Sequence, residues 1–265
     1  MSDATPETDE YLSGGGTTEV ARVGETVRRP HQPWSPRIHQ LFAHLAEAGF
    51  AGAPRTLGMD EAGRDVFGYL AGDVGHYPWS PAVASESALL SAARLLRAYH
   101  DATTDVANQW RDGWRWEARE PVEVVCHNDF APYNCVFDGD RMVGVIDFDT
   151  AGPGPRSWDL AYALYRFAPL SVEDDGGGVA GTPELQAARA RAFLDAYGCT
   201  RAQRAAAVGD VALRLRSLTD FMQASADAGD EAFARHITEG HLDHYLGDIA
   251  YITGHAPLWD TLVVA

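Results

Sequence analysis

The pattern of apolar and polar residues divides the chain into a β-rich first part and a helical remainder. Between residues 11 and 30, β-branched residues alternate with polar ones between glycine breaks, which predicts short strands joined by tight turns, one of them at Gly24 and Glu25. Residues 35–49 carry apolar side chains at helical spacing and end at a glycine, as helices often do. Two more strands are expected at residues 54–60 and 64–73.

From residue 85 onward the apolar spacing is helical. Four apolar stripes predict helices around residues 89–100, 158–165, 215–222 and 242–249. A β-rich stretch interrupts this helical part: an apolar strand is expected to end at Cys126, and a β-hairpin is expected to turn around Gly139. A chain of 265 residues is long enough for one domain with two lobes or for two small domains.

Charge narrows the classes of partner. The net charge of −17 argues against nucleic acid, whose phosphates need a basic surface. It suits a cationic substrate, although a solubilising acidic surface is the simpler explanation. Four arginines fall close together where acids are sparse, and an anion is expected to bind there if anywhere: Arg22, Arg28, Arg29 and Arg37.

Targeting signals are not evident in the sequence. No apolar run reaches the roughly 18 residues of a membrane helix, and the first residues lack the basic and apolar regions of a secretion signal. The three cysteines have neither disulfide-framework nor zinc-finger spacing. We therefore expect a cytoplasmic protein without a membrane partner, whose residues 1–10 are disordered.

The stretch from Cys126 to Asp149 holds the main candidate site. Its sequence is CHNDFAPYNCVFDGDRMVGVIDFD. Counting back equally from the hairpin turn brings Asp147 to the level of the loop that carries Asp129 and Asn134. Two carboxylates and an amide oxygen would then surround one small volume. Oxygen ligands of this kind suit Mg²⁺, which keeps several waters and binds phosphates.

These motifs carry a family resemblance. HNDFAPYN and VIDFD resemble the catalytic loop and metal-binding strand of the aminoglycoside phosphotransferase and choline kinase superfamily. Other segments resemble further elements of that family, so that the resemblance covers about residues 11–167: GGGTT, TVRRP, YLAGD, LLRAYHDAT and WDLAY. It implies an α+β, protein-kinase-like two-lobed fold, with a β-rich, nucleotide-binding N-lobe at 11–72 and a larger, mainly helical C-lobe at 73–265.

The resemblance also implies roles for individual residues. Asp129 would be the catalytic base that accepts the proton of a substrate hydroxyl. Asn134 and Asp147 would hold Mg²⁺ on the phosphates of ATP or GTP. The backbone of two loop glycines would approach these phosphates, and backbone groups near the hinge would meet the base of the nucleotide: Gly15, Gly16, Tyr69 and Ala71.

Four further residues would support this site. His127 is expected to hydrogen-bond within the catalytic loop, and Asp159 to cap or brace that loop. Asp149 has three open interpretations: the metal shell, recognition of a cationic substrate, or an Asx turn. Asn128 replaces the glycine of the family pattern, and asparagine tolerates the left-handed backbone that such a position requires.

The third strand departs from the family pattern. Arginine stands where the family has a phosphate-binding lysine, and the alternation of side chains places Arg28 on the same face as Thr26, the face expected to look toward the nucleotide. We therefore predict Arg28, with Arg29 second, as the phosphate ligand. The only acid of the following helix is Glu47, near its far end, whereas His39 lies nearer. The usual ion pair is thus missing or replaced.

The leading expectation is an ATP- and Mg²⁺-dependent phosphotransferase acting on a hydroxyl of a small molecule. An aminoglycoside or another cationic natural product is the first candidate substrate, with antibiotic resistance as the role. Later acids could meet a cation: Asp220, Glu231, Glu239, Asp243 and Asp248. The alternatives are a metabolic kinase for choline, an amino alcohol or a sugar, and a nucleotide-binding pseudokinase or immunity-like protein without transfer activity. The sequence leaves monomer and dimer open.

Overall fold

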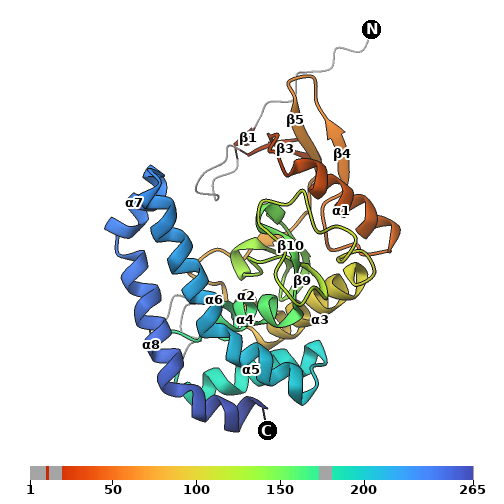
Figure 1. Ribbon diagram of the computed structural model, residues 1–265. Helices are drawn as coiled ribbons and strands as arrows, with labels where there is room; N and C mark the ends of the chain where they lie inside the picture. Colours follow the sequence, from red (N-terminus) through yellow and green to blue (C-terminus); the bar gives the residue numbers. More distant parts are fainter. Residues whose placement is uncertain (1–9, 12–19, 173–180, 265) are drawn as a thin grey trace.

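The structure is a computed structural model of the chain, and it describes residues 10–11, 20–172 and 181–264. Gly15 and Gly16 lie outside these ranges, as do nine of the ten residues expected to be disordered; Glu10 belongs to the first strand. A small β-rich N-lobe stands over a larger helical C-lobe (Figure 1). The expected α+β two-lobed fold is confirmed, while its division at residues 72 and 73 stays a prediction.

The N-lobe is an antiparallel sheet with one helix. Its strands lie in the order β1-β2-β3-β5-β4, with the expected turn at residues 24–25 and a further turn at residues 61–63. The helix buries Leu41 and Phe42, and the Phe42 ring meets the Phe67 ring of the sheet edge-on at 5.2 Å. The element bounds are β1 (Glu10–Tyr11), β2 (Ala21–Val23), β3 (Thr26–Pro30), α1 (Ser35–Glu47), β4 (Thr56–Met59) and β5 (Arg64–Gly68).

The C-lobe contains the remaining helices. The long helix α6 lies against both α4 and α8, and together with α7 these helices form one side of the molecule (Figure 1). The sequence pattern did not predict α2, α5 or α7. The bounds are α2 (Pro81–Ala84), α3 (Glu86–Thr103), α4 (Arg156–Phe167), α5 (Pro183–Tyr197), α6 (Arg201–Asp227), α7 (Glu231–Thr238) and α8 (His241–Trp259), with a closing π-helical turn η3 (Asp260–Val264).

Two small sheets and two helical turns below the N-lobe carry the motif residues. The predicted hairpin forms, with Cys135 opposite Val145. The amide of Ile146 then donates to the carbonyl of Asn134 at 2.9 Å, which brings Asp147 to the level of the catalytic loop as expected. The elements are β6 (Asp73–Val74), β8 (Cys135–Asp138) and β9 (Arg141–Val145) in one sheet, β7 (Val124–Cys126) and β10 (Gly152–Gly154) in the other, and the turns η1 (Pro132–Asn134) and η2 (Phe148–Thr150).

The hinge after β5 requires a glycine. Gly72 has φ +142°, and a Cβ added to it would lie 2.5 Å from the carbonyl oxygen of Phe137. Only a residue without a side chain allows the hinge to approach β8 so closely.

None of the helices in the described part of the chain combines the length and the apolarity that a membrane crossing needs.

Candidate active site

A cavity of about 370 Å³ is lined by residues of both lobes. Apolar side chains such as Val27 and Phe42 line its N-lobe side, and polar side chains of the motif line the opposite side: Asp129, Asn134, Asp147 and Asp149. An apolar wall facing a polar floor suits a ligand that has one planar apolar end and one charged end.

Two side chains hold the carboxylate of Asp129. Oδ2 accepts a hydrogen bond from Nδ2 of Asn134 at 2.8 Å, and Oδ1 accepts one from the hydroxyl of Tyr133 at 2.7 Å. The Tyr133 hydroxyl also lies 2.9 Å from the hydroxyl of Tyr162. Neither tyrosine stood out in the sequence as a candidate site residue. The base is thus oriented from two sides before any substrate is bound.

Asn134 and Asp147 present oxygens to the same volume. Nδ2 of Asn134 donates to both the carbonyl and the carboxylate of Asp129. The Oδ1 atom of Asn134 therefore remains as a potential cation ligand. Asp147 adopts φ +59° and has no hydrogen-bond partner among the described residues. Desolvation by the surrounding protein, and then the like charges of Asp149 and Asp129, raise its pKa. A cation beside Asp147 would relieve this repulsion.

The donor set fits Mg²⁺ only in part. The described residues hold no group of three His, Cys, Asp or Glu side chains that could bind a metal ion. Mg²⁺ commonly takes one or two protein oxygens and completes its shell with water and phosphate. Asn134 and Asp147 therefore fit an ion that arrives with a phosphate ligand, and they do not fit a metal held by protein alone.

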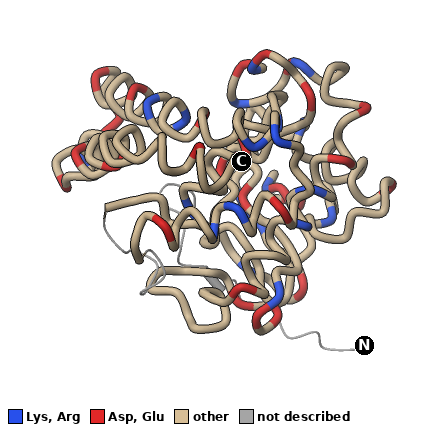
Figure 2. The backbone as a smooth tube through the Cα atoms, turned by 90° about the horizontal axis from the view of Figure 1, so that it is seen from below, with Lys and Arg blue, Asp and Glu red and all other residues tan. Residues whose placement is uncertain are grey.

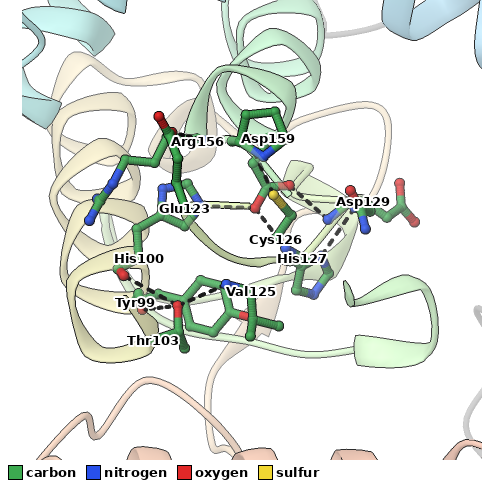
Figure 3. Close-up of polar contacts among 12 residues, drawn as sticks. Tyr99, His100, Thr103, Glu123, Val125, Cys126, His127, Asp129, Arg156 and Asp159 are labelled. Carbon is green, nitrogen blue, oxygen red and sulfur yellow. Dashed lines mark hydrogen bonds and ion pairs between the residues drawn. The ribbon is translucent and has the colours of Figure 1, made fainter. Parts of the chain in front are cut away.

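The buried carboxylate of Asp159 braces the backbone of the catalytic loop (Figure 3). It accepts hydrogen bonds from the backbone amides of His127 at 2.6 Å and Asn128 at 2.7 Å, and it lies 3.0 Å from Nε2 of His100. Burial alone would raise the pKa of Asp159, but the contact with His100 and the loop amide lower it below the ordinary value. The loop backbone is therefore fixed by one ionised side chain on α4.

His127 and Asn128 complete the loop. Nδ1 of His127 accepts from the Asp129 amide at 3.3 Å, so its ring proton lies on Nε2, which donates to the Ile146 carbonyl at 2.9 Å. Asn128 adopts φ +66°, the left-handed geometry expected of the residue that replaces glycine. Its Nδ2 donates to the Thr150 carbonyl at 2.8 Å. Both side chains tie the loop to the segment that carries Asp147.

The pair His100 and Asp159 predicts how stability depends on pH. Burial disfavours the charged ring and lowers the pKa of His100 below 6.5, despite Asp159. The unfolded chain therefore binds a proton on this ring at a pH where the folded chain does not, so stability must fall on acidification. We expect the free energy of unfolding to drop by up to about 1.4 kcal/mol per pH unit below about pH 6.5 from this residue.

Urea unfolding at pH 7.5, 6.5 and 5.5 measures this slope. His100→Gln should flatten it, whereas a change of the exposed His241 to glutamine should leave it as in the wild type. The lowered pKa of Asp159 acts in the same direction, but only below the ordinary aspartate value of 3.8. A stability that stays level or rises from pH 7.5 to 5.5 would contradict the assignment.

Arg29, not Arg28, lines the cavity, opposite to the facing expected from the alternation of side chains; which of the two binds phosphate stays a prediction. Nη1 of Arg29 donates to Oδ1 of Asp149 at 2.5 Å, and its Nη2 is buried without a hydrogen-bond partner. Arg28 lies on the other face and pairs with Asp60 at 3.5 Å. The hydroxyl of Thr26, on the same face as Arg28, donates to the Val23 carbonyl within the hairpin. That face therefore looks away from the site.

An acid of the sheet replaces the missing ion pair. Asp65 on β5 is fully buried, and its Oδ2 lies 3.7 Å from Nε of Arg29. Its carboxylate also contacts Ser35, His31 and His39. Burial would raise the pKa of Asp65, but the hydrogen bonds from these three residues lower it. The signal in the sequence was an acid inside the apolar strand RDVFG.

Asp149 connects the lobes. Its Oδ1 accepts from Arg29 on β3 and from Nε1 of Trp34, the latter at 3.0 Å. Among the described contacts, the side chain of Asp149 makes no hydrogen bond of an Asx turn.

Near the hinge, Tyr69, Leu70 and Gly72 line the cavity, whereas Ala71 is exposed and does not line it. That a backbone group of Ala71 meets the base of a nucleotide stays a prediction.

The acids expected to meet a cation do not gather at one place. Figure 2 shows acidic residues spread over both lobes. Glu239, Asp243 and Asp248 line a second cavity of about 690 Å³ beside Arg166. Asp220 lies in a separate groove between α4 and α6, and Glu231 starts α7, where it is exposed.

The chain is similar to phosphotransferases in sequence and in fold. Residues 110–207 match the model of the phosphotransferase enzyme family. Over 201 aligned residues the chain is 36% identical to a trifolitoxin immunity protein of Rhizobium leguminosarum bv. trifolii. This alignment covers 73% of this chain and 75% of that protein.

Two solved structures share the fold. A choline/ethanolamine kinase family protein from Mesorhizobium loti superposes with a TM-score of 0.58 at 19% identity, covering 94% of each chain. An aminoglycoside 2'-phosphotransferase-IIIa, solved as its GDP complex, superposes with a TM-score of 0.62 at 16% identity, again over 94% of each chain. The motif residues line one cavity, and the sequence and fold are similar to those of phosphotransferases. The chain belongs to the phosphotransferase enzyme family.

Proposed function

We propose that the chain is an ATP- and Mg²⁺-dependent O-phosphotransferase of the cytoplasm that transfers the γ-phosphoryl group to a hydroxyl of a small molecule. The observation that carries the proposal is the common cavity of Asp129, Asn134 and Asp147, with Arg29 on its N-lobe side. The family supports phosphoryl transfer, and a neighbour solved with GDP supports a nucleotide as donor.

Each side chain would have one task. As the new O–P bond forms and the bond from the γ-phosphorus to the bridging oxygen breaks, Asp129 takes the proton of the acceptor hydroxyl and the nucleoside diphosphate leaves. Arg29 offers its unpartnered Nη2 to a phosphate oxygen. Mg²⁺ held by Asn134 and Asp147 would neutralise charge on the phosphates. Positioning and charge neutralisation are the main requirements of this reaction.

The test is a transfer screen with the purified chain. ATP or GTP and Mg²⁺ are incubated with aminoglycosides, choline, ethanolamine and sugars, and mass spectrometry records the gain of one phosphoryl group. A product that depends on both nucleotide and Mg²⁺ supports the proposal. A chain that binds nucleotide but modifies no acceptor, in this or a wider library, counts against it.

A second candidate is an immunity protein that acts without transfer. The 36% identical relative is named for immunity, which agrees with a resistance-type role by either route. Cells that carry the wild type or the Asp129→Asn variant are exposed to a toxic compound against which the wild type protects. Equal protection by both forms would indicate immunity without phosphoryl transfer. Protection by the wild type alone would indicate that transfer is required.

The two neighbouring arginines give a matched pair of variants. Because Arg29 lines the cavity and Arg28 does not, we expect Arg29→Met to raise the KM for ATP by about tenfold to 100-fold, the usual effect of losing a charge-assisted hydrogen bond. Arg28→Met should change it less than about threefold, because Arg28 pairs with Asp60 outside the cavity and such ion pairs contribute little. Steady-state kinetics measure both, and a larger effect of Arg28→Met would reverse the assignment.

A further inference from the structure

The side chain of Arg166 on α4 is half-buried, and its cationic group has no anionic partner among the described residues. Its guanidinium carbon lies 5.2 Å from the ring centres of Tyr77 and Tyr133 and 5.3 Å from that of Tyr165. Its Nε is buried without a hydrogen-bond partner, and no ion pair to Arg166 occurs within the described ranges. Aromatic faces stabilise the charge but leave the N–H donors in the guanidinium plane free.

Two other arginines of the C-lobe that are not exposed do have hydrogen-bond acceptors. Arg189 donates to the carbonyls of Phe167 and Ala84. Arg214 donates to the carbonyl of Asn128 at 2.6 Å. The chain has 38 acids and only 21 basic residues, so a cation left without an acid is unexpected. Buried donors without partners destabilise a protein unless a ligand uses them.

Arg166 lines the second cavity, of about 690 Å³, between α4 and α8. The one buried acid there, Asp248, is already engaged: it accepts from the Tyr165 hydroxyl at 2.7 Å and the Val172 amide at 3.0 Å. Helix α8 begins at this cavity after Gly240, which provides no capping side chain, so the positive end of the helix dipole is also there. The interior of the cavity therefore favours an anion.

The second cavity lies next to the candidate base. Tyr133 lines the interlobe cavity and hydrogen-bonds Asp129, while its ring lies against Arg166, which lines the second cavity. A ligand whose anionic group meets Arg166 is thus about one aromatic ring away from the base. Glu239 and Asp243 are exposed on the rim, where they can meet an ammonium group of the same ligand.

We infer that the acceptor is a hydroxylated molecule with a free carboxylate, and that Arg166 binds this carboxylate. The inference rests on the proposed function and narrows its substrate class. A guanidinium fork matches the two oxygens of a carboxylate, so both can be bound at once. Because of Arg166, the interior of the pocket does not suit the purely cationic acceptor favoured by the net charge. Serine-like or peptide-like zwitterions suit both the interior and the rim.

The experiment compares free acids with their methyl esters. The probes are N-acetylserine, seryl-glycine and threonyl-glycine, each with its ester, and glucose 6-phosphate beside glucose as a second kind of anion. Calorimetry measures binding in the presence of Mg²⁺ and a non-hydrolysable ATP analogue, and mass spectrometry measures transfer. We expect the acids to bind at least about tenfold more tightly than their esters, as for a charge-assisted pair.

Three variants assign this difference to one side chain. Arg166→Gln should remove the acid–ester difference, and Arg166→Lys should restore part of it, because lysine keeps the charge but not the fork. Arg94→Gln, at an exposed position on α3, removes the same charge elsewhere and should leave the difference unchanged. Unchanged nucleotide binding shows that each variant is folded.

The outcomes separate the two proposals. Transfer to neutral or cationic acceptors, without an acid–ester difference, would keep the proposed function and overturn the carboxylate site. A difference that survives Arg166→Gln, a preference for the phosphate anion, or a library in which no acid binds would also overturn it. Acids that bind through Arg166 but are never phosphorylated would support the carboxylate site and reject the transfer function.

Discussion

Replacing Asp129 with asparagine is expected to lower kcat by about 10²- to 10⁴-fold, the usual contribution of a general base. Asparagine has the same shape and keeps one oxygen for the Tyr133 hydroxyl, which lies 2.7 Å from the carboxylate in the wild type. It cannot accept the proton of the acceptor. The loss should therefore fall on kcat, while the KM for nucleotide changes only a few-fold.

Single-turnover kinetics with a substrate from the screen measure this effect. Asp140→Asn is the matched control, because Asp140 lies exposed at the hairpin turn of the same motif and its replacement removes the same charge. Its kcat should equal that of the wild type. A reduction by Asp129→Asn of less than tenfold would show that another group takes the proton.

Replacing Asp159 with alanine is expected to lower the free energy of unfolding by about 3–5 kcal/mol, because three buried or half-buried donors lose their charged acceptor and each unsatisfied donor costs about 1–3 kcal/mol. The variant leaves the amides of His127 and Asn128 without acceptors and removes the partner of His100. Asp159→Asn should cause a smaller loss, since one side-chain oxygen remains for the loop. Urea unfolding at pH 7.5 measures both variants.

Asp101 provides the comparison for Asp159. Its side chain is 47% exposed and pairs with Arg97 and Arg156. Replacing it with alanine should lower stability by less than about 1 kcal/mol, as surface ion pairs generally do. If Asp159→Ala were as mild as Asp101→Ala, the catalytic loop would have to be supported by something other than this carboxylate. If Asp159→Ala does not fold, Asp159→Asn decides the question.

Local signals predicted much of the fold. The helix at residues 35–49, the turn at Gly24 and Glu25, and the hairpin around Gly139 each depend on neighbouring residues, and each forms. The alignment of Asp147 with the catalytic loop followed from counting back along the two strands from the turn, although β9 is one residue longer than β8 and the register shifts between Val136 and Phe137. Helix α5 was missed because it buries small residues such as Ala187 and Ala190, which give a weak apolar stripe.

Contacts between distant parts of the chain could not be predicted. The face of β3 that meets the site depends on how the sheet packs on α1, and Thr26 was a misleading marker because its hydroxyl serves the hairpin. Asp65 reaches Arg29 only through the pairing of β3 with β5. In the sequence alone, Arg166 looks like an ordinary residue of a helix. Its aromatic neighbours Tyr77 and Tyr133 come from distant parts of the chain, so their contact with Arg166 could not be predicted.

The contact between Arg29 and Asp149 has a consequence for the affinity of the chain for nucleotide. It crosses from one lobe to the other, and it uses the same guanidinium that a phosphate would need. For a chain that binds nucleotide as proposed, a phosphate can meet Nη2 of Arg29 directly, but a phosphate held by both terminal nitrogens must displace the carboxylate already in place on Nη1. Only the fraction of molecules in which this contact is broken is ready to bind in this second way, and the apparent dissociation constant rises in inverse proportion to that fraction. Asp149 thus acts as an internal competitor that sets how much nucleotide the protein requires.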